Sequence, residues 1–183
     1  MKSTAIAVLN CLFNQTKEIM IILQNISYIH PDKELLFDQI NLSVNRHDKV
    51  ALIGNNGTGK STLLKIIAGK LEHSSGQINR AAMPYYLPQI FGQFNHLTVA
   101  QALNVESKLR ALKEILAGKV TEENMTVLNE DWDIEERCNQ ALEYWQLNDL
   151  DLSQKLNSLS GGQKTKVFLA GISIHRPEII LLD

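Results

Sequence analysis

Residues 54–61 of the sequence read Gly54-Asn55-Asn56-Gly57-Thr58-Gly59-Lys60-Ser61. This stretch matches the pattern G-x-x-x-x-G-K-[ST] at every fixed position. A short apolar run at residues 49–53 precedes it, and apolar residues recur at helical spacing over residues 61–71. A strand, a glycine-rich loop and a helix in this order predict a loop that binds phosphate groups.

Each residue type in this loop has a physical reason. Glycine tolerates positive φ and leaves room for backbone N–H groups to converge on phosphate oxygens. The following helix directs the positive end of its dipole at the same oxygens. Lys60 can place its charge on the β- and γ-phosphates, Ser61 can give a hydroxyl to Mg²⁺, and Thr62 can donate to an α-phosphate. The residues expected to bind the nucleotide are Gly54, Asn55, Asn56, Gly57, Thr58, Gly59, Lys60, Ser61 and Thr62.

A second motif, Leu159-Ser160-Gly161-Gly162-Gln163, lies about a hundred residues downstream, at the start of a helical pattern over residues 160–175. Two adjacent glycines at a helix start leave N–H groups free for an anion, with support from the helix dipole. Taken alone, the motif is also compatible with an ordinary helix start capped by Ser160.

Composition limits the classes of function. The 183 residues carry a formal net charge of −2, with 44% hydrophobic and 21% charged residues. This balance argues against a strongly basic nucleic-acid-binding module, so we predict no DNA partner, although a local basic patch could still contact RNA. No stretch approaches the roughly 18 apolar residues of a membrane span. Cys11 and Cys138 have no zinc or disulfide spacing, and the five histidines are scattered.

Apolar periodicity indicates how the chain is organised. Strands are expected at residues 20–26, 35–44, 49–53, 76–79, 83–87 and 179–182, and helices dominate the middle third. Alternation of strands with helices implies an α/β core that contains a parallel element. We therefore expect a poorly structured extension over residues 1–19, a nucleotide-binding domain over 20–183, and a helical subdomain at about 98–175.

With both motifs in one chain, the sequence resembles the ATP-binding cassette (ABC) ATPase family over residues 20–183. The resemblance implies a P-loop NTPase (RecA-like) core with an antiparallel β subdomain and an inserted α-helical subdomain. It implies ATP and Mg²⁺ as cofactors. In this family a glutamine after a strand, here Gln89, contacts magnesium and the attacking water. An aromatic residue upstream of the loop, here Tyr28, stacks on the adenine.

The same resemblance assigns magnesium binding to Ser61, Gln89 and Asp183, and catalytic roles to Gln89 and Lys60. The family places a glutamate directly after the aspartate as the base that polarises water. The sequence given ends at Asp183, so we expect a cassette that is incomplete at the C-terminus. ATP binding is expected of this chain, with negligible hydrolysis, and ATP hydrolysis is expected of a longer parent protein.

Cassettes of this family act in pairs, because the signature of one closes over the phosphates held by the other. The residues Leu159, Ser160, Gly161, Gly162 and Gln163 are therefore expected to act on a second cassette, either in the same parent chain or in a homodimer.

Three readings of the whole protein stay open. Residues 54–69, 86–89 and 129–137 resemble the first cassette of bacterial ABC-F proteins, cytoplasmic proteins that act on ribosomes. The stretch 129–137 is also compatible with an acidic helix start capped by Asp133. The alternatives are the ATP-binding subunit of an ABC membrane transporter, peripheral to the inner membrane, and a truncated nucleotide-binding module without hydrolysis.

Overall fold

The structure is a computed structural model that describes residues 7–8 and 18–183. Its contacts divide the chain into two units, Met1–Tyr86 with Pro177–Asp183, and Leu87–Arg176. Most of the predicted extension over residues 1–19 lies outside the described residues. Within the described part, Ala7–Val8 forms strand β1, and the next strand begins at Ile19.

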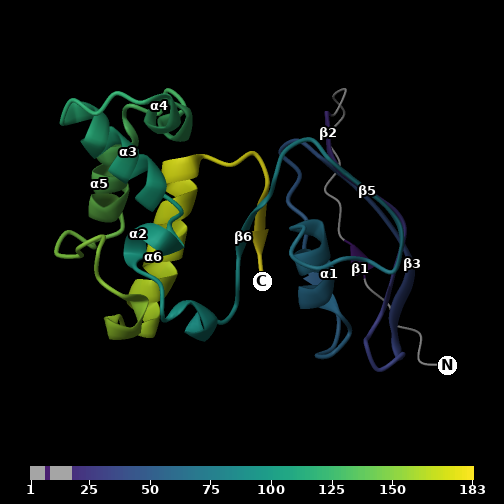
Figure 1. Ribbon diagram of the computed structural model, residues 1–183. Coiled ribbons are helices and arrows are strands. Elements are labelled where there is room, and N and C mark those ends of the chain that lie inside the picture. The colour runs from purple at the N-terminus through teal and green to yellow at the C-terminus, as the bar shows by residue number, and fades with distance from the viewer. Residues whose placement is uncertain (1–6, 9–17) are drawn as a thin grey trace. The chain divides into compact units, whose positions relative to one another are not determined.

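Among the described residues, the first unit holds the strands, apart from Leu87 at the end of the strand β6, and the helix α1 (Figure 1). Its elements are β1 (Ala7–Val8), β2 (Ile19–Ile29), β3 (Leu35–Asn45), β4 (Leu52–Ile53), α1 (Lys60–Ile67), β5 (Ser75–Arg80), β6 (Tyr85–Leu87) and β7 (Ile180–Leu182).

An antiparallel sheet of order β3-β2-β5 confirms the predicted antiparallel β subdomain. Its register pairs Leu23 with Leu42 on one side and with Ile78 on the other. The strand β2 is longer than the predicted residues 20–26 and includes Tyr28. The strand β4 is shorter than predicted, with Ile53 half-exposed, and pairs antiparallel with β1.

The strands β6 and β7 form a pair, in which the Tyr85 amide donates to the Ile179 carbonyl at 2.9 Å. Figure 1 shows the two strands running in the same direction, which is the parallel element that the sequence predicted. Since β7 lies far downstream of β6 in the chain, this pairing brings the end of the sequence beside Tyr86.

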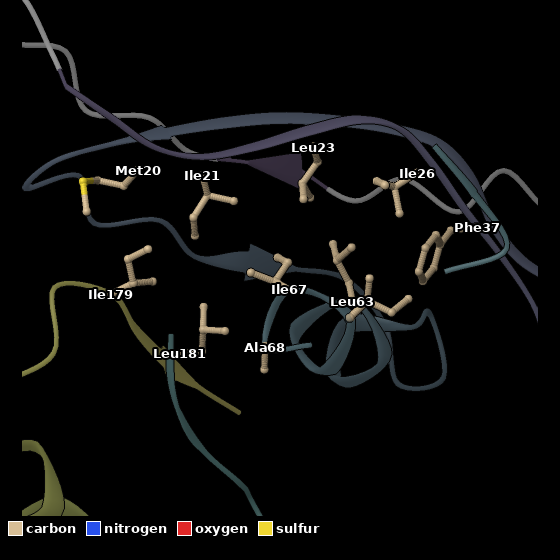
Figure 2. Close-up of a cluster of buried hydrophobic side chains, with 11 residues drawn as sticks. Met20, Ile21, Leu23, Ile26, Phe37, Leu63, Ile67, Ala68, Ile179 and Leu181 are labelled. Atoms are coloured by element: carbon tan, nitrogen blue, oxygen red, sulfur yellow. The ribbon is translucent and has the colours of Figure 1, made fainter. Parts of the chain in front are cut away.

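One hydrophobic core holds the helix α1 against the sheet (Figure 2). Leu63 and Ile66 of α1 are almost fully buried, and they pack in a cluster with residues from β2, β3 and β7. The other buried members of this cluster are Met20, Ile21, Leu23, Ile26, Phe37, Ile67, Ala68, Ile179 and Leu181. Burial of this apolar surface fixes the start of α1, and with it the glycine-rich loop.

The helix α1 ends at Ile67, earlier than the predicted end near residue 71. Gly69 adopts a φ of +68°, and the Lys70 amide donates to the Lys65 carbonyl at 2.8 Å, which closes the helix. The Arg80 guanidinium also donates to the carbonyls of Ile67 at 2.6 Å and Ile66 at 2.8 Å. A positive charge at a helix C-terminus is favourable, so this side chain stabilises the observed end.

The second unit is helical. Its elements are η1 (Gly92–Phe94), α2 (Val99–Ala102), α3 (Glu106–Leu116), α4 (Glu122–Leu128), α5 (Ile134–Tyr144), η2 (Leu156–Ser158) and α6 (Gly161–His175). Cys138 and Ile174 are among its fully buried core residues.

A network of ion pairs joins the helices of this unit. Asp131 accepts a hydrogen bond from Lys108 of α3 at 2.6 Å and forms an ion pair with Arg137 of α5. Arg137 also donates to the Ile174 carbonyl near the end of α6 at 2.8 Å. Asp133 stands at the N-cap of α5, the position that the alternative interpretation of the sequence gave it, but its side chain makes no capping hydrogen bond. Its carboxylate pairs with Arg137 at 3.2 Å instead.

Within the described residues, no helix has the length and apolar character needed to span a membrane.

Candidate functional site

The glycine-rich loop has the backbone that the motif requires. Gly57 and Gly59 have φ values of +83° and +92°, the left-handed region that favours glycine. A Cβ atom on Gly59 would lie 2.9 Å from the Phe37 ring and 3.0 Å from Leu36, whereas one on Gly57 would meet nothing within 4 Å. The second glycine is therefore required by both conformation and space, and the first by conformation alone.

The start of α1 is open to an anion. Gly59 is its N-cap, no side chain caps the first turn, and no acidic residue lies in it. The first N–H groups of a helix have no partner within the helix, and the positive end of the dipole lies beside them. Residues 54–57 before the helix are exposed. The loop and the helix start thus offer N–H groups that a phosphate could reach.

Lys60 lies inside the curve of this loop. Its Nζ atom donates to the Gly54 carbonyl at 2.9 Å and to the Asn55 carbonyl at 2.8 Å. The Thr58 hydroxyl donates to the same Asn55 carbonyl at 2.9 Å. These bonds hold the ammonium group among the predicted phosphate-binding residues, and carbonyl partners at a half-exposed position can be exchanged for phosphate oxygens.

Ser61 and Asp183, two of the three residues predicted to bind magnesium, lie in contact. The Ser61 hydroxyl donates to one carboxylate oxygen of Asp183 at 2.6 Å, although 122 positions separate the two residues. Because the proton of Ser61 points at Asp183, the lone pairs of the hydroxyl oxygen remain available to a cation. Hydroxyl and carboxylate oxygens are ligands that suit Mg²⁺.

Tyr86 completes this group, and we had not predicted a role for it. Its hydroxyl donates to the second carboxylate oxygen of Asp183 at 2.6 Å. Burial first, and then the hydrogen bond to Asp183, raise the pKa of Tyr86, so the phenol keeps its proton and acts as the donor. Its place near the end of a strand beside the strand that leads to Asp183 was the signal that could have identified it.

Tyr28, the predicted adenine platform, lies half-buried on β2. Its ring centroid is 6.0 Å from that of Phe37 and 6.2 Å from that of His30, which is exposed. Phe37 is also the residue that a side chain at Gly59 would meet. Tyr28 therefore belongs to an aromatic cluster that reaches the phosphate loop, and it contributes to the core at the same time.

Gln89, the remaining predicted magnesium contact, is exposed and follows β6. It belongs to the second unit, whereas the loop belongs to the first. Two positions further on, Phe91 stacks on Phe168 of α6 with ring centroids 4.8 Å apart. Gln89 thus lies in a short link between a strand that carries Tyr86 and an aromatic anchor in the helical unit.

The second motif forms the start of α6. Ser160 is the N-cap, and its hydroxyl accepts a hydrogen bond from the Gln163 amide at 3.3 Å. The Gln163 side chain accepts in return from the Ser160 amide at 2.9 Å, which makes a capping box. Gly161 and Gly162 are exposed, and a Cβ atom on either would meet nothing within 4 Å. Their N–H groups belong to the first turn of a helix of 15 residues, at its positive end.

The described residues contain no cluster of three or more His, Cys, Asp or Glu side chains that could hold a metal ion alone. A site made of Ser61, Asp183 and phosphate oxygens suits an ion such as Mg²⁺, which takes one or two protein ligands and keeps the rest of its shell from phosphates and water.

A strand, a glycine-rich loop and a helix, in a chain that also contains an antiparallel sheet and a helical unit, define a P-loop NTPase of the cassette type. The match with known families makes this specific. Residues 37–183 match the family model described as ABC transporter, and the chain belongs to this family.

Two curated relatives illustrate the likeness. The chain is 30% identical over 175 residues to the tylosin resistance ATP-binding protein TlrC of Streptomyces fradiae, covering 83% of this chain and 32% of that protein. It is 32% identical over 182 residues to the energy-coupling factor transporter ATP-binding protein EcfA of an aster yellows witches'-broom phytoplasma, covering 90% of this chain and 59% of that protein. The chain therefore spans about a third of the first relative and less than two thirds of the second.

Among solved structures, the ATP-binding subunit of an ABC transporter matches with a TM-score of 0.64 and 22% identity, covering 90% of this chain and 65% of that one. This likeness confirms the predicted fold class.

Proposed function

We propose that the chain is the nucleotide-binding part of an ATP-binding subunit of an ABC transporter and that it binds ATP with Mg²⁺ at the loop of residues 54–62. One observation carries the binding proposal. Ser61 at the helix start and Asp183 at the end of β7 meet at 2.6 Å beside an open phosphate loop. A loop that holds phosphate without a metal would not need this pair of oxygen ligands.

The residues have separate tasks in this proposal. Gly54 to Gly59 present backbone N–H groups, and Lys60 leaves its carbonyl partners to neutralise the phosphates. Ser61 and Asp183 bind Mg²⁺, and the Tyr28 ring stacks on the adenine. Bound Mg²⁺ supplies charge neutralisation at the phosphates.

We further propose that the whole protein hydrolyses ATP when it is paired with a second cassette. Gln89 would position the attacking water, and the segment Leu159–Gln163 would offer the N–H groups of Gly161 and Gly162 to the nucleotide of the second copy or cassette. Positioning and electrostatic stabilisation supply most of the rate in such phosphoryl transfers.

The experiment is nucleotide binding by Lys60→Ala, measured by calorimetry with ATP and Mg²⁺. Hydrogen bonds to charged groups contribute about 1.5–3 kcal/mol each. Loss of the ammonium group should therefore weaken ATP affinity by at least about tenfold. Lys65→Ala is the matched control, because Lys65 lies exposed on the same helix and away from its start. Equal affinities for Lys60→Ala and the unaltered chain would contradict the assignment of this loop.

The transporter reading is favoured over the ABC-F reading by two observations. The relative EcfA and the solved cassette above are both transporter subunits by name. In addition, residues 129–137, the stretch most suggestive of an ABC-F protein, have a structural explanation. Asp131, Asp133 and Arg137 in that stretch form an ion-pair network within the helical unit.

Residues 118–131 are likewise accounted for within the helical unit. They contain the helix α4, which packs against α3, and Asn124 donates to Glu114 of α3 at 3.1 Å. One observation supports the ABC-F interpretation, namely the likeness to a tylosin resistance ATP-binding protein. Co-purification of the tagged whole protein from solubilised membranes with a membrane-spanning subunit is the expected result. Co-sedimentation with ribosomes in the presence of ATP, with no membrane partner, would favour the alternative.

A further inference from the structure

The carboxylate of Asp183 is held from two sides. Ser61 donates to one oxygen and Tyr86 donates to the other, both at 2.6 Å. A carboxylate with one partner can rotate about its last side-chain torsion, whereas two donors on different oxygens fix its plane. Ser61 belongs to the proposed metal site, but the Tyr86 phenol has no place in the nucleotide-binding roles described above.

The Tyr86 side chain is itself fixed. It lies on β6, whose pairing with β7 is secured by the bond from the Tyr85 amide to the Ile179 carbonyl. Its ring is half-buried and packs against the core cluster of the first unit. The Lys70 ammonium group lies 5.7 Å from the ring centroid, within the range of a cation–π contact. The hydroxyl is thus a preset donor aimed at Asp183.

We propose that Tyr86 is a positioning residue for magnesium. Its hydroxyl orients the Asp183 carboxylate so that the oxygen nearer Ser61 takes part in binding the Mg²⁺ that accompanies ATP. This inference rests on the proposed function of the loop. Residues that hydrogen-bond to metal-binding side chains orient those side chains, and removing such a partner typically weakens metal affinity by about 10–100-fold.

The test separates metal binding from nucleotide binding. ATP affinity of the full chain is measured in saturating Mg²⁺ and again in EDTA, and the ratio of the two dissociation constants gives the enhancement by magnesium. In Tyr86→Phe we expect this enhancement to fall by about tenfold. The affinity in EDTA should stay within about twofold, because the phenol does not touch the phosphate loop in this proposal.

Two further variants define what the result means. Tyr144→Phe is the matched control, because it loses the same hydroxyl from an exposed position in the helical unit and should leave both affinities unchanged. In an Asp183→Asn background, adding Tyr86→Phe should change the enhancement no further, since its proposed effect acts through the carboxylate. Electron paramagnetic resonance of Mn²⁺ with a non-hydrolysable ATP analogue gives a second readout, in which the Tyr86→Phe spectrum should differ from that of the unaltered chain.

Two outcomes would overturn the inference. A purely structural role for Tyr86 would weaken ATP binding equally with and without the metal. An unchanged enhancement in Tyr86→Phe would show that the phenol has no influence on magnesium. Failure of the proposed function looks different, because the unaltered chain would then show no magnesium-dependent ATP binding at all.

Discussion

Gly59 allows the strain in the phosphate loop to be measured, because Gly57 provides a natural comparison. Both glycines have positive φ, +83° at Gly57 and +92° at Gly59. Only Gly59 is crowded, with a Cβ position 2.9 Å from Phe37 and 3.0 Å from Leu36. Replacing each with alanine therefore adds a similar backbone cost, and at Gly59 a steric cost as well.

The magnitudes follow from these contacts. An L-residue in the left-handed region costs about 1–2 kcal/mol, offset by about 0.4–1 kcal/mol because alanine restricts the unfolded chain. Gly57→Ala should therefore lower the free energy of unfolding by about 1 kcal/mol. Forcing an extra carbon into a packed site costs about 1–3 kcal/mol more. Gly59→Ala should lower the free energy of unfolding by about 2–4 kcal/mol.

The assay is urea unfolding of both variants without nucleotide, so that stability is measured apart from ATP binding. A double variant, Gly59→Ala with Leu36→Ala, provides an internal check. Shortening Leu36 removes its close contacts at 3.0 Å and leaves the one with Phe37 at 2.9 Å, so the double variant should lose somewhat less stability than the sum of the two single changes. Equal losses for Gly57→Ala and Gly59→Ala, or strict additivity with Leu36→Ala, would refute this reasoning.

Two other predictions concern Arg80, at the end of α1 in the first unit, and the buried Cys138 in the helical unit. Arg80→Met should lower the free energy of unfolding by about 2–3 kcal/mol, because it removes two charged hydrogen bonds from the end of α1 at a half-exposed position, where solvent reduces the contribution of each. The exposed Arg110→Met should change it by less than about 0.5 kcal/mol, and a similar loss for both would contradict the capping role. Burial raises the pKa of the Cys138 thiol from 9.0 to about 11. In a Cys11→Ser variant at pH 8, the folded chain should react with an aromatic disulfide at least about 100-fold more slowly than the urea-unfolded chain. Because the folded-state pKa is raised, the thiol contributes its full stabilisation below pH 9, and the difference in free energy of unfolding between this chain and Cys138→Ala should decline toward pH 11. A difference that does not change with pH would contradict the raised pKa.

The phosphate loop could be predicted from sequence because its chemistry is local. The pattern at residues 54–61 fixes glycines where the backbone turns, and the structure has positive φ at Gly57 and Gly59. Strands with apolar runs, such as β2 and β3, were also found, since burial of one face leaves a regular pattern.

The features that sequence analysis missed depend on partners distant in the chain. Arg80 shortens α1 from 13 positions away, and no pattern within the helix reveals this. Tyr86 meets Asp183 across 97 positions, through a strand pairing that the sequence does not specify residue by residue. Asp133 is a local exception: it occupies the N-cap of α5, as one interpretation of the sequence had it, but its carboxylate pairs with Arg137 one turn later and makes no capping hydrogen bond.

The motif at Ser160 shows that a structural role and a proposed functional role can coexist. Ser160 caps α6, as the simpler interpretation of the sequence predicted. In that cap the hydroxyl oxygen accepts from the Gln163 amide, so its own proton is not used by this bond. The same hydroxyl can therefore donate to a phosphate oxygen while the cap stays intact, beside the exposed amides of Gly161 and Gly162. A capped helix start and an anion site differ in which atoms they use, and for this reason the cap by itself is no argument against the proposed contact with the nucleotide of a second cassette.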